Sequence, residues 1–206
     1  TVDDVFGVDV TLDVSDEKLF TFKSNVSGSV DFAAARGYLD FAEAVVKASD
    51  LSACATTGAS CESWLLDDVG KRLFRRRLAS DEKTRYQALL AAGTAEGGAN
   101  EGARWVLEAM LQSPSFLYLD EVVEADGFLD DLSIATRLAL TIWGTNPDAK
   151  LLTAAEAGKL STKQQIAAEA ERLLADPRSI GGLTDFVDQW FRLEKLDDPD
   201  ARPDLP

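Results

Sequence analysis

The sequence predicts an all-α protein of roughly eight helices, arranged as two packed helical bundles with a short extended N-terminal arm. Apolar residues recur at three- and four-residue spacing through most of the 206-residue chain, which is the period of a helix with one buried face. Gly, Pro, Ser or Asp stands at nearly every point where such a stripe begins or ends. No segment makes a convincing sheet.

We expect four parts along the chain. They are an N-terminal arm and helix (1–50), a disulfide-stapled helical domain (51–119), a second helical bundle (120–196) and a linker or processed end (197–206). The two bundles are expected to meet near residues 113–127.

The N-terminal part predicts one long helix behind a less regular arm. Residues 1–13 predict a helical turn, followed by an alternating run that is either a short strand or an extended arm. Residues 15–29 are polar and predict a loop, with Phe20 and Phe22 turned inward. Residues 31–48 place their apolar side chains on one helical face.

Two helices follow the cysteines. An apolar stripe covers residues 64–78, and Ser80 is a good N-cap for the next helix, which has an acidic first turn and is expected to end at Gly93. Residues 96–102 are rich in glycine. Because no Lys-Ser/Thr pair follows and no strand leads in, this stretch predicts a connection between helices rather than a phosphate-binding loop.

The middle of the chain joins the two expected bundles. Residues 103–111 predict a strongly apolar helix that ends before Pro114. Residues 116–119 predict a short extended or turn segment. The acidic residues within 120–126 do not follow the spacing of an EF-hand, so they predict a solvated loop rather than a calcium site.

The clearest prediction is a helix, tight turn and second helix over residues 129–159. The apolar stripe of the first helix consists of Leu132, Ala135, Leu138, Ala139, Ile142 and Trp143. The candidate N-terminal caps are Asp130, Asp131 and Ser133. Gly144 ends this helix because glycine accepts a left-handed conformation, and the second helix begins near Pro147 or Asp148.

Two more helices complete the prediction. Ser161 is expected to cap the first, and the second starts near residue 178. The glycine pair at 181–182 allows close packing of this last helix. Trp190 and Phe191 are expected in the core, with an aromatic sugar platform formed by the two as the alternative.

Composition narrows the possible functions. Against 36 Asp and Glu the chain has 21 Lys and Arg, and the net charge of −15 disfavours nucleic acid or an anionic membrane as partner. No apolar run is long enough to span a membrane. Histidine is absent, which excludes Ser-His and Cys-His nucleophile pairs and His-ligated metal or haem within this chain. We therefore expect no cofactor in this chain.

Cys54 and Cys61 enclose a short loop of small residues. Their spacing is neither that of a CxxC redox motif nor that of a haem-attachment motif. We expect a structural disulfide, and hence an oxidising compartment, with a reactive thiol pair or metal site as the alternative.

Three further side chains are candidate interaction residues. Arg76 belongs to a run of three arginines near a helix end, where it either binds an anion or pairs with carboxylates of the chain. Arg137 lies within an otherwise apolar helix, which indicates either a position beside a haem or metal held by another chain or a snorkelling or salt-bridged arginine. The third candidate is Trp190.

Five separated blocks resemble, in order, domain families of unknown function of the 1595 and 1592 types. The blocks are KRLFRRRLASDEKTRY, EGARWVLEAMLQSPSFLYLDE, LSIATRLALTIWGTNPDAKLLTAAEAGKLS, AERLLADPRS and FVDQWFRLEKLD. The opening TVDDVFGVD is similar to the start of the preceding 1587-type domain. Such domains occur in large secreted proteins of planctomycetes and myxobacteria, often fused to c-type cytochrome domains and carbohydrate-binding modules. The resemblance therefore implies a periplasmic or extracellular setting. It supplies no established catalytic residues.

The leading hypothesis is a non-catalytic helical interaction or scaffold subunit, or a processed fragment, of a larger periplasmic or extracellular assembly. Its partner would be another protein chain or the remaining domains of the parent protein, in a hetero-oligomer. One alternative is a component of a redox enzyme or electron-transfer complex whose haem or metal is held by another chain, with Arg76 and Arg137 beside it. The other is a polysaccharide-binding module.

Overall fold

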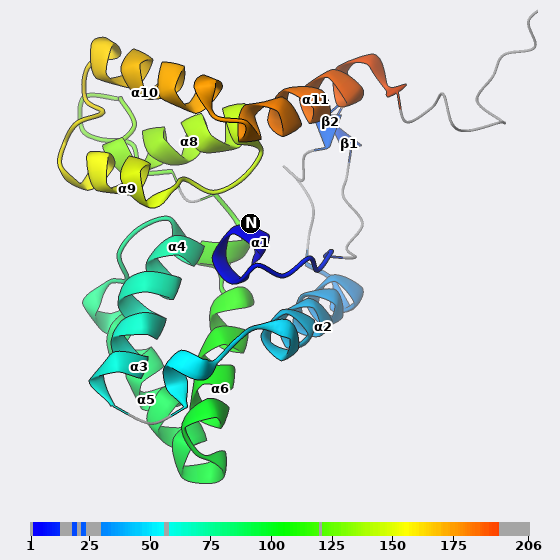
Figure 1. The fold of residues 1–206 in the computed structure, drawn as a ribbon, viewed down its shortest axis with the longest axis vertical. Helices are drawn as coiled ribbons and strands as arrows, with labels where there is room; N and C mark the ends of the chain where they lie inside the picture. Colours follow the sequence, from blue (N-terminus) through cyan, green and yellow to red (C-terminus); the bar gives the residue numbers. More distant parts are fainter. Residues whose placement is uncertain are drawn as a thin grey trace, which may run out of the picture.

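The computed structural model describes residues 2–12, 18–19, 22–23, 30–55, 58–119 and 121–193, with the backbone alone for 18–19 and 22–23. Two groups of helices make up this part of the chain (Figure 1), so the all-α prediction is confirmed. In the described ranges the strands form one small antiparallel hairpin, in which β1 (Lys18–Leu19) pairs with β2 (Phe22–Lys23). This hairpin lies where the sequence predicted a loop.

The first group of helices comes from the N-terminal half. Its elements are α1 (Val2–Phe6), α2 (Phe32–Ala48), the 3-10 helix η1 (Ser52–Cys54), α3 (Ala59–Ser63), the π-helix η2 (Trp64–Val69), α4 (Gly70–Phe74), α5 (Ser80–Gly97), α6 (Ala99–Leu111) and α7 (Pro114–Leu117). α3, η2 and α4 follow one another without a break. The largest fully buried side chains in this half are Leu65, Leu73, Leu107, Met110 and Leu111.

The second group consists of α8 (Asp131–Trp143), α9 (Ala149–Glu156), α10 (Lys163–Ala175) and α11 (Arg178–Phe191). It has a separate hydrophobic cluster made of Ala135, Ala139, Ile142, Trp143, Leu151, Ala155, Leu160 and Leu173. The exact domain boundaries expected from the sequence stay predictions. No helix within the described ranges is both long and apolar enough to cross a lipid bilayer.

The predicted helix, turn and helix over 129–159 is confirmed. The Asp130 carboxylate accepts from the backbone N–H of Ser133 at 2.8 Å and caps α8. Gly144 ends α8 at φ +71°, and the Asp148 carboxylate caps α9 by accepting from Leu151 N–H at 2.8 Å. The other two cap candidates, Asp131 and Ser133, therefore do not cap α8. In both α8 and α9 the cap is the side chain just before the first helical turn.

Gly93 does not end its helix, contrary to the prediction. α5 continues to Gly97, and the connection to α6 shrinks to Gly98, whose φ is +86°. Gly93 is buried where α5 and α6 cross, since a Cβ built on it would lie 2.8 Å from the Cα of Gly102. The glycine thus serves close helix packing rather than termination.

Two predicted caps are each displaced by one residue. Ser80 is the first residue of α5, and the Glu82 carboxylate reaches back to the Ala79 N–H at 2.7 Å instead. Thr162, not Ser161, caps α10, because its hydroxyl and the Gln165 side chain bond reciprocally to each other's backbone N–H groups.

Further differences concern shorter segments. The segment predicted as extended or turn over residues 116–119 begins within the helical turn α7, which Pro114 and the Ser113 cap favour. The helix expected over 64–78 ends at Phe74. The N-terminal helical turn is confirmed, and no strand is assigned to residues 8–12, which form an arm. The side chains of Phe20 and Phe22 lie outside the described residues.

Candidate interaction site

The outer face of α11 carries apolar side chains that the described part of the chain leaves exposed. They are Ile180, Leu183, Phe186, Val187, Trp190 and Phe191. Trp190 is 57% exposed and Phe191 is 65% exposed, so the prediction that both lie in the core is wrong. The helix is amphipathic as predicted. No described helix covers this face, although the strand β2 contacts α11 and Phe186 is not without a partner.

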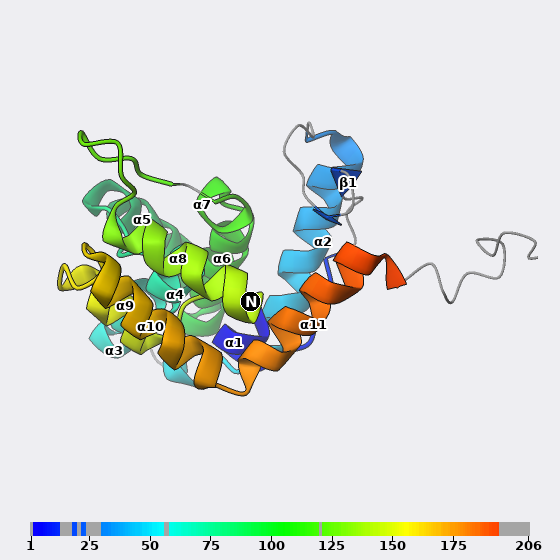
Figure 2. The same ribbon diagram turned by 90° about the horizontal axis from the view of Figure 1, so that it is seen from above.

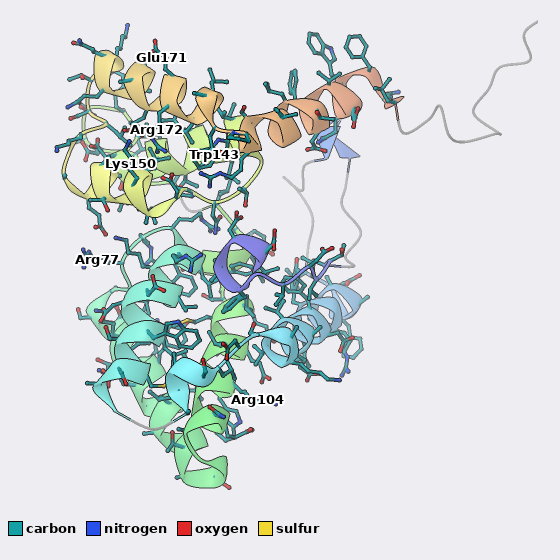
Figure 3. All side chains as sticks on the ribbon, viewed as in Figure 1. Arg77, Arg104, Trp143, Lys150, Glu171 and Arg172 are labelled. Carbon is teal, nitrogen blue, oxygen red and sulfur yellow. A yellow bond between two sulfur atoms is a disulfide. The ribbon has the colours of Figure 1, made fainter. Side chains whose placement is uncertain are left out.

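The aromatic residues of this face contact one another. The ring centroids of Phe186 and Trp190 are 5.4 Å apart at a tilt of 57°, and those of Trp190 and Phe191 are 5.5 Å apart at 25°. Such pairs limit side-chain motion and keep the rings together on the surface. Several side chains of α11 point away from the two helical groups (Figure 3).

The beginning of α11 is fixed against α8. A Cβ on Gly182 would lie 2.3 Å from the carbonyl oxygen of Ile142, which confirms the close packing predicted for this glycine. Nothing lies within 4 Å of a Cβ on Gly181, so that half of the prediction is wrong. Because its start is held, the rest of α11 extends beyond α8 and α10 (Figure 2).

Arg178 and Trp143 complete this anchor. The guanidinium carbon of Arg178 lies 3.5 Å from a ring centroid of Trp143, whose Nε1–H donates to the Leu173 carbonyl at 2.8 Å. Arg178 also pairs with Asp176 at 2.8 Å. Its hydrogen bonds hold the pKa of Asp176 at about 2, so this carboxylate stays ionised.

Arg76 is engaged within the first helical group. Its two terminal nitrogens donate to the two oxygens of Glu82 at 2.8 and 3.0 Å, and Nη2 also donates to Ser115 Oγ at 3.1 Å. The hydrogen bond from Arg76 lowers the pKa of Glu82, against the effect of burial. The arrangement matches the salt-bridged alternative for Arg76.

Arg75 is the buried member of the arginine run. It ends α4 at φ +59°, and its Nη2 donates to the carbonyl oxygens of Ser115 at 2.7 Å and Tyr118 at 2.9 Å. Desolvation and the neighbouring Arg76 lower its pKa. Arg75 therefore holds the segment that leads from one helical group to the other.

Arg137 lies on the surface rather than in an apolar site. It forms a bidentate ion pair with Glu121, and its side chain is 60% exposed. The hydrogen bond from Arg137 lowers the pKa of Glu121. A hollow of about 50 Å³ between Arg76 and Glu121 has room for water but not for an organic ligand.

A polar junction connects the two helical groups. Glu156 at the end of α9 accepts from Lys71 Nζ at 2.9 Å and from Arg77 Nε at 2.9 Å. Arg77 lies at the edge where the two groups face each other (Figure 3). Asn146 Nδ2 donates to the Arg72 carbonyl at 3.0 Å. Burial raises the pKa of Glu156, but the hydrogen bonds from both cations bring it below its usual value.

Cys54 and Cys61 form the predicted disulfide, with their Cα atoms 4.6 Å apart. Both residues are buried, and the bond ties η1 to α3. The burial and the bond fit the structural disulfide better than the alternatives of a reactive thiol pair or a metal site. Within the described ranges, no group of three or more Cys, Asp or Glu side chains is arranged to hold a metal ion.

The exposed α11 face is the feature that sequence reasoning missed. Its residues follow the helical period that also marks a core stripe, and periodicity alone does not show what covers a face. No local signal in the sequence marks such a face, and none marks the ion pairs of Glu156.

Comparison with known families supports the sequence blocks noted above. Residues 61–121 match the family described as protein of unknown function (DUF1595), and residues 129–205 match the family described as protein of unknown function (DUF1592). Searches of curated proteins and of solved structures found no match. The resemblance of the opening residues to a 1587-type domain stays a prediction. The chain thus joins a DUF1595-type region to a DUF1592-type region, in the order predicted from the sequence.

Proposed function

We propose that this chain is a non-catalytic helical interaction module that packs through α11 against a protein partner. The observation that carries the proposal is the set of six exposed apolar side chains on one face of α11. Contiguous apolar surface of this kind marks protein interaction sites, because covering it recovers about 25 cal/mol for each Å² removed from water.

The setting we propose is a larger periplasmic or extracellular assembly. The buried Cys54–Cys61 disulfide is compatible with an oxidising compartment. The partner is another chain or the remaining domains of the parent protein, and the net charge of −15 favours a basic protein over nucleic acid. Within this proposal the ion pairs of Arg76 and Arg137 stabilise the module itself.

The proposal is tested on the isolated chain by hydrophobic-dye fluorescence and sedimentation. Wild type should bind the dye and self-associate at high concentration because α11 lacks its partner. Trp190→Ser combined with Phe191→Ser should reduce both effects and leave the melting temperature unchanged. The matched control is Phe32→Ser combined with Phe128→Ser, which removes two exposed aromatic residues outside α11 and should change neither. A wild-type chain that stays monomeric and binds no dye contradicts the proposal.

Polysaccharide binding is a second candidate, favoured by the exposed rings of Trp190 and Phe191. Sugar rings stack on such aromatic faces through their apolar C–H surfaces. The continuation of the face through Ile180, Leu183 and Val187 fits a protein better, since aliphatic side chains offer no stacking surface. Pull-down on insoluble glycans with wild type and Trp190→Ser separates the two candidates.

The redox alternative remains a proposal with a simple test. It places haem or a metal in a partner chain, beside this module. A haem absorption band that co-migrates with the chain during purification would favour it. An assembly with no such band would favour the interaction module alone.

A further inference from the structure

An open pocket of about 370 Å³ lies between the two helical groups. The first group contributes residues of α1, which lies where the two groups face each other (Figure 1), and of the segment formed by η2 and α4. The second group contributes the turn between α8 and α9 and the start of α11. Pockets that hold small ligands have volumes of about 300 to 1,000 Å³, so a small molecule fits here. The polar residues that line it are Asp4, Asp68, Arg72, Asn146, Asp148 and Arg178.

Asn146 presents an unused acceptor to this pocket. The residue is only 6% exposed, and its Nδ2 donates to the Arg72 carbonyl at 3.0 Å. That bond identifies which end of the amide is the nitrogen. Within the described ranges, no residue donates a hydrogen bond to the other end, Oδ1, and this oxygen is not sealed from solvent. Because Asn146 lines the pocket, an N–H group of a ligand there can bond to Oδ1.

The two arginines of the pocket already have acceptors. Arg72 donates from Nη1 to the Val5 carbonyl at 3.2 Å and from Nη2 to the Asp4 carbonyl. Arg178 donates to the two carboxylate oxygens of Asp176 at 3.0 and 2.8 Å. An anionic ligand would have to compete with these oxygens for the guanidinium groups, so the pocket does not favour an anion.

Two of the three carboxylates of the pocket are also engaged. Asp4 accepts from the hydroxyl group of Thr145. Asp148 accepts from the two terminal nitrogens of Arg172 at 2.9 and 3.2 Å, and it caps α9. Its negative charge therefore already offsets the positive end of that helix, which removes a second reason for an anion to bind.

Asp68 is the carboxylate that can take another partner. Its side chain is 58% exposed, and its ion pair with Arg72 has a separation of 4.0 Å, which is too long for a charge-assisted hydrogen bond. Three carboxylates against two guanidinium groups make the pocket net negative, as the whole chain is at −15. The pocket thus combines a buried acceptor, an exposed carboxylate and a negative potential, which together select a ligand that donates hydrogen bonds and carries positive charge.

We propose that this pocket binds a small organic cation that carries a primary ammonium or guanidinium group. One N–H of the ligand donates to Asn146 Oδ1, and its cationic group pairs with Asp68. Because both helical groups form the walls, the bound cation joins them next to the Asn146–Arg72 hydrogen bond. The site is separate from the apolar face of α11, and the proposal does not depend on the interaction function.

Isothermal titration calorimetry of the purified chain tests this inference. The probe is agmatine, which has a guanidinium group at one end and a primary ammonium group at the other. Agmatine should bind with one site per chain, whereas phosphate and magnesium chloride, at matched ionic strength, should not bind. In nuclear magnetic resonance spectra, agmatine should shift the signals of the Asn146 side-chain amide.

Two variants locate the site. Asp68→Asn should weaken agmatine binding by about tenfold, because it removes the charged partner of the ligand. Asp81→Asn, which changes an exposed carboxylate outside the pocket, is the matched control and should leave the affinity unchanged. Ala149→Leu should also weaken binding by about tenfold or more, since it narrows the pocket at the exposed first residue of α9 and keeps every charge. Melting curves of each variant check that the fold is kept.

The results divide into two sets. Weaker binding in both pocket variants, together with the shift at Asn146, supports the site even where one variant is less stable than wild type. Absence of agmatine binding at millimolar concentration, or equal binding of phosphate, would overturn the proposal. An equal loss of affinity in Asp68→Asn and Asp81→Asn would overturn it as well, because diffuse attraction to an acidic chain would then explain the binding. None of these results bears on α11.

Discussion

Arg77 and Glu156, which are 79 residues apart in the sequence, join the two helical groups through an Nε to Oε1 hydrogen bond of 2.9 Å. Lys71 donates to the other oxygen of the same carboxylate at 2.9 Å. One acidic side chain from the second group thus neutralises two cations from the first. The two groups have separate hydrophobic clusters, so Glu156, together with the Asn146–Arg72 hydrogen bond, contributes to how they are oriented.

Glu156→Gln should loosen the junction. The neutral amide weakens both charged hydrogen bonds, and we expect the free energy of unfolding to fall by about 1 kcal/mol. Small-angle X-ray scattering should show a larger radius of gyration. Asp81→Asn, which removes an exposed pair with Arg85 within one helix, should change neither quantity. Unchanged scattering for Glu156→Gln would show that other contacts fix the orientation.

Glu82 should make stability depend on pH. Its pKa is lowered in the folded state, so its contribution is fully present above its unfolded pKa of about 4.3 and is lost as pH falls through the folded value. Glu82→Gln should cost about 1 to 2 kcal/mol at pH 7 and much less at a pH below the folded value. Urea denaturation across this range, with Glu96→Gln as control, measures the difference. An equal cost at both values would contradict the linkage.

The two adjacent glycines of α11 should respond in opposite directions. Gly182→Ala should destabilise the chain by about 2 kcal/mol, because the new methyl group collides with the Ile142 carbonyl. Gly181→Ala meets open space and should stabilise α11 by up to about 1 kcal/mol through helix propensity. Thermal unfolding measures the stability of both variants. A similar change in melting temperature for the two would contradict the packing of α11 on α8.

Removing the disulfide should be costly although the loop is short. For a separation of seven residues, the loss of loop-closure entropy predicts about 2.5 kcal/mol for Cys54→Ser combined with Cys61→Ser. Dithiothreitol should destabilise wild type by a similar amount and leave the double variant unaffected. A reductant effect that persists in the double variant would have to come from another source.

Capping and termination rules, which act within a few residues, correctly predicted the helix ends that depend on neighbouring residues. Gly144 and the Asp residues before each helix correctly predicted the end of α8 and the start of α9, because termination and capping act within a few residues. The same reasoning failed at Gly93, where a glycine inside a helix serves contact with a distant glycine. Sequence spacing does not distinguish these two uses.

The candidate site was predicted in part. Trp190 was singled out, but the face around it was assigned to the core, since an apolar stripe looks the same whether the chain or a partner covers it. The partners of Arg76 and Arg137 are carboxylates, as one alternative held. Glu156 was missed because its contacts join segments that no spacing rule relates.

Native mass spectrometry of the assembly purified from its source cells tests the central claim most directly. We expect the 22.3 kDa chain in a complex with a second protein, and loss of that complex when Trp190→Ser and Phe191→Ser are introduced together. The Phe32→Ser and Phe128→Ser control should keep it. A wild-type chain found alone, or a complex that survives the α11 substitutions, would contradict the account.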